Sequence, residues 1–249
     1  MRALTFEGIG LVVACKGQDG AAPAASSNRP GTPIPSSTTP PSSLPIQSPA
    51  SPDAGGSPLK WDFESDKPGA PPAGFSFART GQGRDGTWLV RAEPDAPSGA
   101  NVLAQGDGDS TDHRFPIAVA DAPLLRDLDL QVRCKPVSGT VDQACGMVFR
   151  YRDANNYYVT RANALEGNVR LYFVKAGQRQ QIASFSGRVT SGAWHDYRVV
   201  AEGDHFEVYW NGTKVIDHHD RTFGEAGKLG LWTKADSVTY FDNLRVSPL

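Results

Sequence analysis

The chain has 249 residues and a nearly balanced formal charge of −2. This balance argues against a nucleic-acid-binding protein, which would show a basic patch or a strongly basic overall charge. With 26 glycines, 19 prolines and 9% aromatic residues, the composition favours a chain rich in β-strands and turns. We therefore expect no nucleic-acid partner.

The first fifteen residues, MRALTFEGIGLVVAC, have the order of a secretory signal: a basic residue, a short apolar run, then small residues. Residues 12–15, Val-Val-Ala-Cys, resemble the lipobox of bacterial lipoproteins, in which the cysteine is diacylated. The resemblance implies that Cys15 carries lipid and that this lipid is the protein's contact with a membrane. It also implies an extracytoplasmic location in a bacterial cell envelope. Glu7 interrupts the apolar run, and an ordinary N-terminus with a stray cysteine is the alternative.

Residues 16–58 form a linker rich in proline, serine and threonine. This segment has no aromatic residue and too little apolar area to offset the entropy of ordering, so we expect it to be disordered. Fully extended at ~3.1 Å per residue, it would reach on the order of 100 Å. Such a tether would hold a domain away from a membrane.

Residues 59–249 show short segments of alternating polarity separated by turn residues, which indicates an all-β domain. Asn211-Gly212 is the favoured dipeptide of a type I′ hairpin. The pattern predicts one β-sandwich or jelly roll, and we expect a monomer. The expected strands cover residues 61–64, 88–91, 101–105, 115–119, 128–134, 146–152, 157–163, 169–174, 181–185, 194–202, 206–210, 214–217, 228–232 and 238–246.

Alternation assigns side chains to faces, because successive side chains of a strand point to opposite sides. Leu229 and Leu231 share the core parity, which leaves Trp232 on the other face. The same reasoning places three further side chains outward: Arg150, Arg170 and Tyr172. The parity of residues 157–163 is ambiguous.

Cys134 and Cys145 remain as a pair if Cys15 carries lipid. Both lie on the apolar parity of their strands, and an extracytoplasmic location permits a disulfide. They would bridge if they face each other across adjacent strands, where Cβ atoms come within ~3.5–4.5 Å. Two buried free thiols are the alternative.

A resemblance to a known family is carried by the stretches WLVRAEPDAPSGANVLAQ, RFPIAVAD, CKPVSGTVDQACGMVFRYRDANNYYVTRANALEGNVRLY, GAWHDYRV and GLWTKADSVTYFDNLRV. They resemble the bacterial extracytoplasmic domains grouped with 3-keto-disaccharide hydrolases, distant relatives of family 16 glycoside hydrolases and laminin G domains. The resemblance covers residues 61–247. It implies a concanavalin A-like jelly roll of two antiparallel sheets, one of them concave.

Family 16 chemistry is not expected, because the sequence lacks that family's Glu-x-Asp-x-x-Glu strand. The resemblance to the keto-glycoside enzymes implies an eliminative route instead, which needs a base for an acidified C2 proton and a donor for the enolate oxygen. Glu166, in a loop between two strands, is the candidate base. Arg161 is the candidate catalytic arginine that steadies the oxyanion, and Arg150 and Arg170 are further candidates for that role. The alternative is that Glu166 is a turn residue and the arginines form surface ion pairs.

A glycan-binding surface without catalysis needs an aromatic ring for the sugar face and polar groups for its hydroxyls. Side chains of these kinds are expected at one sheet face and its rim: Arg150, Tyr158, Asn163, Arg170, Tyr172, Trp232, Lys234 and Asp236. The alternative is that the aromatic residues only pad a sheet beneath a loop.

A structural Ca²⁺ is the one cofactor expected, since hard cations take carboxylate and carbonyl oxygens. Asp62, Glu64 and Asp242 lie where the first and last strands should meet and are its candidate ligands. The sequence of residues 217–220, Asp-His-His-Asp, has ligand-type residues but no recognised spacing. Capped turns are the alternative at each place.

These features together predict an extracytoplasmic domain that acts on carbohydrate. An enzyme for 3-keto-glycosides requires a pocket in which a carboxylate and an arginine converge. A lectin-like module requires an aromatic platform, and a structural envelope lipoprotein requires neither.

Overall fold

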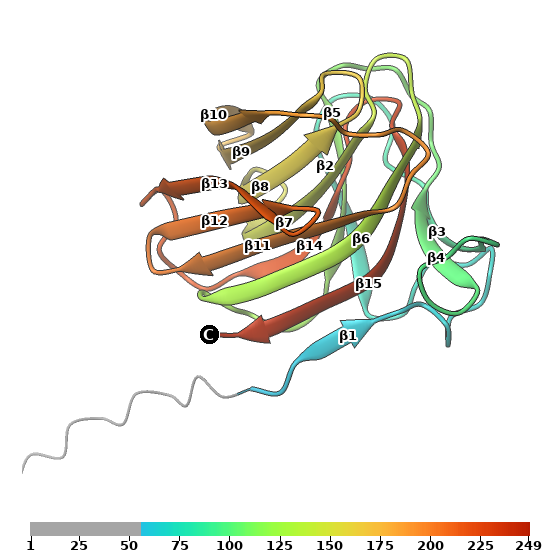
Figure 1. The fold of residues 1–249 in the computed structure, drawn as a ribbon, viewed down its shortest axis with the longest axis horizontal. Helices are drawn as coiled ribbons and strands as arrows, with labels where there is room; N and C mark the ends of the chain where they lie inside the picture. Colours follow the sequence, from blue (N-terminus) through green and yellow to red (C-terminus); the bar gives the residue numbers. More distant parts are fainter. Residues whose placement is uncertain (1–55) are drawn as a thin grey trace, which may run out of the picture. The chain divides into compact units, whose positions relative to one another are not determined.

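The computed structural model describes residues 56–249, and the predicted signal segment, Cys15 and nearly all of the predicted linker lie outside the described residues. The regular elements of the described part are fifteen β-strands, arranged as two antiparallel sheets (Figure 1). None of the residues from 56 onward belongs to a helix long and apolar enough to cross a membrane. The predicted all-β sandwich of the concanavalin A-like jelly-roll class is confirmed.

The eight-stranded sheet contains β1 (Leu59–Trp61), β3 (Trp88–Ala92), β4 (Asn101–Gln105), β6 (Leu128–Ser138), β11 (His195–Glu202), β12 (His205–Trp210), β13 (Thr213–His219) and β15 (Val238–Pro248). Its order is β13-β12-β11-β6-β15-β4-β3, and β1 pairs with β15. The seven-stranded sheet contains β2 (Phe75–Gly81), β5 (Arg114–Ala120), β7 (Ala144–Asp153), β8 (Asn156–Asn163), β9 (Asn168–Lys175), β10 (Gln178–Ser186) and β14 (Lys228–Trp232). Its order is β10-β9-β8-β7-β14-β5-β2.

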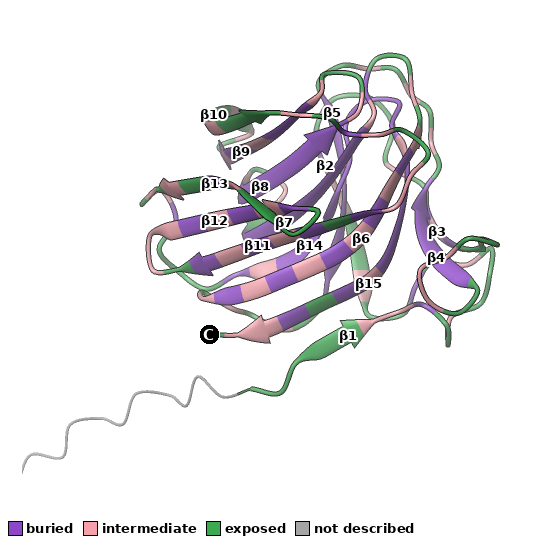
Figure 2. Ribbon diagram, viewed as in Figure 1, coloured by how far each residue is buried: buried purple, intermediate pink, exposed green. Residues whose placement is uncertain are grey.

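The two sheets differ in how they are buried (Figure 2). Strand β6 alternates between buried and half-buried residues, because one of its faces packs on the core and the other faces solvent. Strands β5, β7 and β8 are buried almost throughout, on both faces. The seven-stranded sheet therefore has a second buried side, beyond the core that it shares with the other sheet.

Two details of the predicted strands differ from the structure. Strand β2 is not predicted, because it lies at the sheet edge and its residues are mostly exposed or half-buried, with Phe77 41% exposed. The first predicted strand, residues 61–64, shares only Trp61 with β1. The chain leaves the strand after Trp61, and Phe63 has a positive φ of 62° that ends the extended conformation.

A disulfide joins Cys134 and Cys145, whose Cα atoms are 6.3 Å apart. This confirms the predicted pairing but corrects its geometry. Cys134 lies on β6 and Cys145 on β7, so the two residues belong to opposite sheets and not to adjacent strands of one sheet. The bond therefore crosses the sandwich core and fastens one sheet to the other.

Candidate functional site

The second buried side of the seven-stranded sheet points away from the sandwich core. Its apolar side chains form a cluster of their own that includes Phe115, Tyr157, Tyr172 and Trp232. The hydroxyl of Thr80 on β2 lies 2.7 Å from that of Tyr157 on β8, although three strands separate β2 from β8 in the sheet order. The sheet must curve strongly to bring them together, and we call this side the concave face.

Strand register fixes one row of side chains across the concave face. On β9, β8, β7 and β14 in turn, the row consists of Arg170, Arg161, Gly146 and Trp232. A Cβ atom at Gly146 would lie 3.1 Å from the Trp232 ring and 3.2 Å from the Arg161 Cβ. Glycine therefore leaves the space in which the indole and the arginine side chain lie next to each other.

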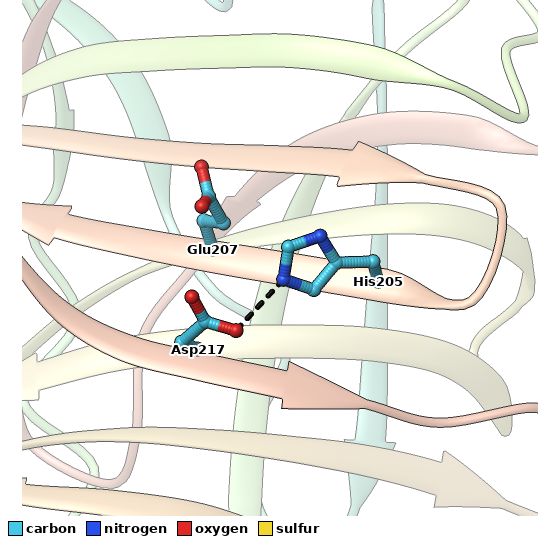
Figure 3. A group of neighbouring side chains, drawn as sticks. All are labelled: His205, Glu207 and Asp217. Carbon is cyan, nitrogen blue, oxygen red and sulfur yellow. Dashed lines mark hydrogen bonds and ion pairs between the residues drawn. The ribbon is translucent and has the colours of Figure 1, made fainter.

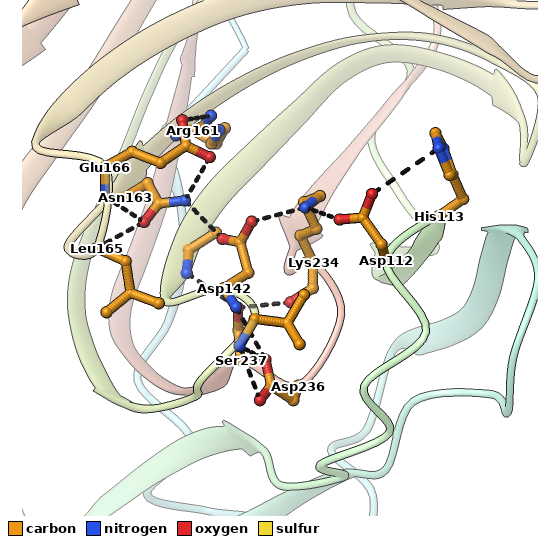
Figure 4. Close-up of polar contacts among 12 residues, drawn as sticks. Asp112, His113, Asp142, Arg161, Asn163, Leu165, Glu166, Lys234, Asp236 and Ser237 are labelled. Atoms are coloured by element: carbon orange, nitrogen blue, oxygen red, sulfur yellow. Dashed lines mark hydrogen bonds and ion pairs between the residues drawn. The ribbon is translucent and has the colours of Figure 1, made fainter.

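Glu166 is held at the rim of this face by the arginines of the row. Its carboxylate lies 2.8 Å from Arg161 and accepts a hydrogen bond of 3.2 Å from Asn163 (Figure 4). Arg170 at 2.9 Å and Asn168 at 3.1 Å complete its contacts. Although burial opposes ionisation, these partners lower the pKa of Glu166 to about 2. A carboxylate stabilised in this way is a weak proton acceptor near neutral pH.

The low pKa of Glu166 makes its contribution to the stability of the fold depend on pH. Because its pKa in the folded protein lies below the ordinary value of 4.5, its ion pairs contribute stability that is fully present above about pH 4.5 and is lost as the pH falls through about 2. We expect the Glu166 carboxyl carbon, followed by NMR, to titrate near pH 2. Arg161→Gln should raise that midpoint, and a midpoint near 4.5 in the unaltered protein would contradict the ion pairs.

A series of hydrogen bonds and ion pairs connects Asn163 with the loop after β14 (Figure 4). The amide of Asn163 donates to Oδ1 of Asp142 at 2.7 Å, and Oδ2 of Asp142 lies 2.9 Å from the ammonium of Lys234. Lys234 also pairs with Asp112. Burial raises the pKa of Asp142 in spite of the nearby ammonium. Asp142 and Glu166 both accept a hydrogen bond from Asn163. Even so, the pKa of Asp142 is raised and that of Glu166 is lowered.

Asp236 ties two loops of the site together (Figure 4). Its carboxylate accepts hydrogen bonds from the main-chain N–H groups of Thr140 at 2.6 Å, Val141 at 3.1 Å and Asp142 at 2.9 Å. These bonds occupy both carboxylate oxygens. The predicted contact of Asp236 with a substrate is therefore replaced by a positioning role, in which it fixes the loop that carries Asp142.

Most of the predicted site residues do come together. The structure places on the concave face or its rim Arg161, Asn163, Glu166, Arg170, Tyr172, Trp232 and Lys234. Leu229 and Leu231 lie in the main core, as their parity predicts, while Trp232 on the same strand joins the concave-face cluster. Alternation along β14 therefore identifies the correct face for its aromatic side chain.

Arg150 does not belong to this site. Its guanidinium lies over the Phe206 ring of the main core and donates to the carbonyls of Arg126 at 2.8 Å, Gly203 at 2.6 Å and Phe223 at 2.9 Å. The backbone of Arg150 has a positive φ of 46°, next to an irregularity in the pairing of β7 with β8. Side-chain alternation shifts at such an irregularity, so the prediction of an outward, substrate-binding Arg150 is wrong.

Tyr158 is also misplaced by the prediction. Its ring stacks on Phe149 in the main core, with centroids 5.2 Å apart, and its hydroxyl donates to Asp220. Tyr157 and Arg161 take the opposite parity on β8 and face the concave side. The structure thereby settles the ambiguous parity of residues 157–163 and removes Tyr158 from the site.

Three residues of the site are not identified from the sequence: Phe115, Asp142 and Arg179. Asp142 lies in a loop, and its place in the site depends on an ion pair with Lys234, which is distant in the sequence. Arg179 falls before the predicted strand 181–185, whereas β10 begins at Gln178. If the predicted strand had begun at residue 178, its alternation could have assigned Arg179 to a face of the sheet.

The fold brings two of the three candidate calcium ligands to one loop and leaves the third apart. Glu64 and Asp242 both accept main-chain hydrogen bonds from the loop at residues 98–101. Burial, with a smaller effect of the Glu64 charge, raises the pKa of Asp242. Asp62 instead pairs with Lys60 at 3.2 Å and is well exposed. Asp62 is therefore not part of the same group, and calcium stays a prediction for Glu64 and Asp242 alone.

Within residues 56–249, one group of metal-ligating side chains is close enough to suggest an ion: His205, Glu207 and Asp217 (Figure 3). His205 Nε2 lies 2.7 Å from Asp217. The ammonium of Lys214 lies 2.8 Å from Glu207 and 2.6 Å from Asp217, where a metal ion would have to bind. The lysine neutralises these carboxylates itself, and we assign no metal to the group.

The fold and this site define a β-sandwich domain of the jelly-roll class with one strongly curved, polar-rimmed sheet. A family model of the 3-keto-alpha-glucoside-1,2-lyase-like domain matches residues 113–247, which is more than half of the chain. The protein belongs to this family. The match includes the strands and loops that form the row of Arg161 and Trp232.

The chain is also similar to individual proteins. The levanase of Bacillus subtilis (strain 168) is 31% identical over 104 residues, which is 41% of this chain and only 15% of the levanase. The carbohydrate-binding module CBM66 from Bacillus subtilis superposes with a TM-score of 0.54 at 23% identity, covering 69% of this chain and 94% of the module. The cellulose-induced protein Cip1 gives 0.54 at 11% identity, covering 77% and 97%. At such identities the two structures support the fold alone.

Proposed function

We propose that this protein binds carbohydrate on the concave face of its seven-stranded sheet. The observation that carries the proposal is the meeting of two aromatic rings, buried beneath the Arg179 guanidinium, with a charged rim. The rings of Phe115 and Trp232 stack with centroids 5.4 Å apart and 19° between their planes. Beside them stand Arg161 and Arg170, with Glu166 between the two guanidinium groups.

This mixture fits the chemistry of a sugar. Sugars have faces of C–H groups, which pack against aromatic rings, and an edge of hydroxyl groups, which bind charged and amide side chains. Glu166 and the half-exposed Arg170 offer an acceptor and a donor at the rim. The similarity to a levanase and to a carbohydrate-binding module supports the same ligand class.

A lyase acting on 3-keto-glycosides is the second candidate, favoured by the family name and by the pair of carboxyl groups. A general base works best with a pKa near the pH of the reaction. The pKa of Glu166 is lowered to about 2, whereas that of Asp142 is raised by burial. In a catalytic reading, Asp142 is therefore the better proton acceptor than the predicted Glu166, and Arg161 is the donor for the enolate oxygen.

We propose further that the protein is located outside the cytoplasm and attached to a membrane through lipid at Cys15. The order of residues 1–15 carries this part of the proposal. The disulfide between Cys134 and Cys145 supports it, because structural disulfides persist mainly in oxidising compartments. Mass spectrometry of the protein from its native membrane fraction, with a diacylglycerol adduct at Cys15 as the expected result, tests the anchor.

Calorimetric titration of the full chain with a glycan panel tests the ligand class. The panel contains levan, β-glucans and 3-keto-disaccharides, and product is followed by mass spectrometry. We expect binding that Arg170→Gln weakens about ten- to a hundredfold, since a charged hydrogen bond contributes about 1.5–3 kcal/mol. Arg245→Gln, on the exposed side of the other sheet, is the matched control and should bind normally.

The outcomes separate the candidates. If no glycan of the panel binds, the carbohydrate proposal is wrong. If a 3-keto-disaccharide is cleaved, and Asp142→Asn stops cleavage while Glu166→Gln retains it, the lyase is correct. Binding without any product from the keto-sugars identifies a module without catalysis.

A further inference from the structure

Arg179 lies in the middle of the concave face. Its guanidinium carbon is 4.6 Å from the centre of the Tyr172 ring and 4.7 Å from that of Phe115, with Trp232 at 5.8 Å. Tyr172 lies on β9 and Phe115 on β5, so one guanidinium reaches side chains from both arms of the curved sheet. Cation–π contact with three rings holds it there.

Arg179 has no acidic partner. Within residues 56–249 it makes no ion pair, and its buried Nη1 has no hydrogen-bond partner. The other two arginines of the face, Arg161 and Arg170, share Glu166. Burial, with a smaller effect of the Arg161 charge, lowers the pKa of Arg179. The Arg179 guanidinium therefore carries a positive charge with which no carboxylate of residues 56–249 forms an ion pair.

Several buried N–H groups of the concave face have no hydrogen-bond partner, including the indole Nε1 of Trp232. Buried polar atoms in proteins are nearly always bonded, so a cluster of exceptions calls for a reason. In the described part of the chain, Arg161 Nε and Arg170 Nε lack partners, as does Arg179 Nη1. The neighbouring acidic oxygen, Oδ2 of Asp142, is already matched by Lys234 at 2.9 Å. These N–H groups are able to donate to an acceptor group that a ligand brings.

Arg179 lies where its guanidinium could pair with a bound ligand. It lies on β10, an edge strand whose residues are mostly exposed or half-buried. Its side chain covers the aromatic rings without being part of the main core. Movement of this one side chain would uncover the ring faces and leave its guanidinium at their margin, without repacking the sandwich.

We propose that the concave face selects sugars that carry a carboxylate, and that Arg179 is the residue that pairs with it. The inference rests on the proposed carbohydrate function and names its ligand class, an acidic sugar of the uronic acid type. The planar guanidinium matches a carboxylate with two parallel N–H···O bonds, which an ammonium group does not reproduce. The sugar ring then stacks on Trp232 and Phe115.

The test is calorimetry of the full chain with matched pairs of ligands: methyl glucuronide against methyl glucoside, and methyl galacturonide against methyl galactoside. We expect at least one uronide to bind tenfold or more tightly than its neutral partner, with affinity that falls between 50 and 500 mM NaCl. Arg179→Gln should remove the preference, and Arg179→Lys should restore only part of it. Arg245→Gln is the control for charge, and the melting temperature of each variant checks its fold.

Each outcome bears on a different claim. Equal binding of uronides and neutral glycosides overturns the acid preference and leaves the carbohydrate proposal intact. Binding of neither class, here and across the wider glycan panel, overturns both. A preference for uronides that persists in Arg179→Gln overturns the role of Arg179.

Discussion

Trp232→Ala is expected to abolish glycan binding and to lower the free energy of unfolding by about 3–5 kcal/mol, the usual range for truncating a fully buried Trp. The indole is 0% exposed and stacks on Phe115, so its removal leaves a cavity under the concave face. It also deletes the ring on which a sugar would stack once the Arg179 guanidinium, 5.8 Å from the indole, moves aside. Trp232→Phe, which keeps an aromatic ring, should retain much of both properties. Chemical unfolding and calorimetry measure the two effects.

A matched variant separates binding from stability. Trp210 is also buried, but it lies on β12 of the other sheet and stacks on His195 in contact with the main core. Trp210→Ala should therefore lose a comparable amount of stability and still bind glycan. If both alanine variants bind equally well, the concave face is not the ligand site.

Replacement of Cys134 and Cys145 by alanine is expected to lower the free energy of unfolding by about 3 kcal/mol, given the short loop that the disulfide closes. The loss should be visible as a lower midpoint in urea. Treatment of the unaltered protein with a reductant should give a similar loss, which excludes an effect of the alanine side chains. An unchanged midpoint after complete reduction would show that the bond is not needed to hold the sheets together.

The architecture could be predicted from the sequence because it depends on local patterns. Period-two alternation along residues 228–232 correctly separates Leu229 and Leu231 from Trp232. The same rule fails at Arg150, where a positive φ and a pairing irregularity change the side to which the chain points. Alternation holds only while the strand is regular, and nothing local in the sequence marks this irregularity.

The site is less predictable because its chemistry depends on distant contacts. Glu166 and Arg161 are near in sequence, and their association could be anticipated. The raised pKa of Asp142, by contrast, comes from burial in the folded protein. The role of Arg179 requires the sheet to curve until its guanidinium contacts both Tyr172 on β9 and Phe115 on β5. Curvature is a property of the whole sheet, so no single stretch predicts it.

Strand β1 determines how the domain is presented to its surroundings. The chain enters through Leu59–Trp61, which pair with β15 in the eight-stranded sheet, whereas the concave face belongs to the seven-stranded sheet. Strand β1 thus lies in the layer behind the concave face. The first described residues and the concave face therefore belong to different layers, so a ligand on the curved sheet has no contact with β1.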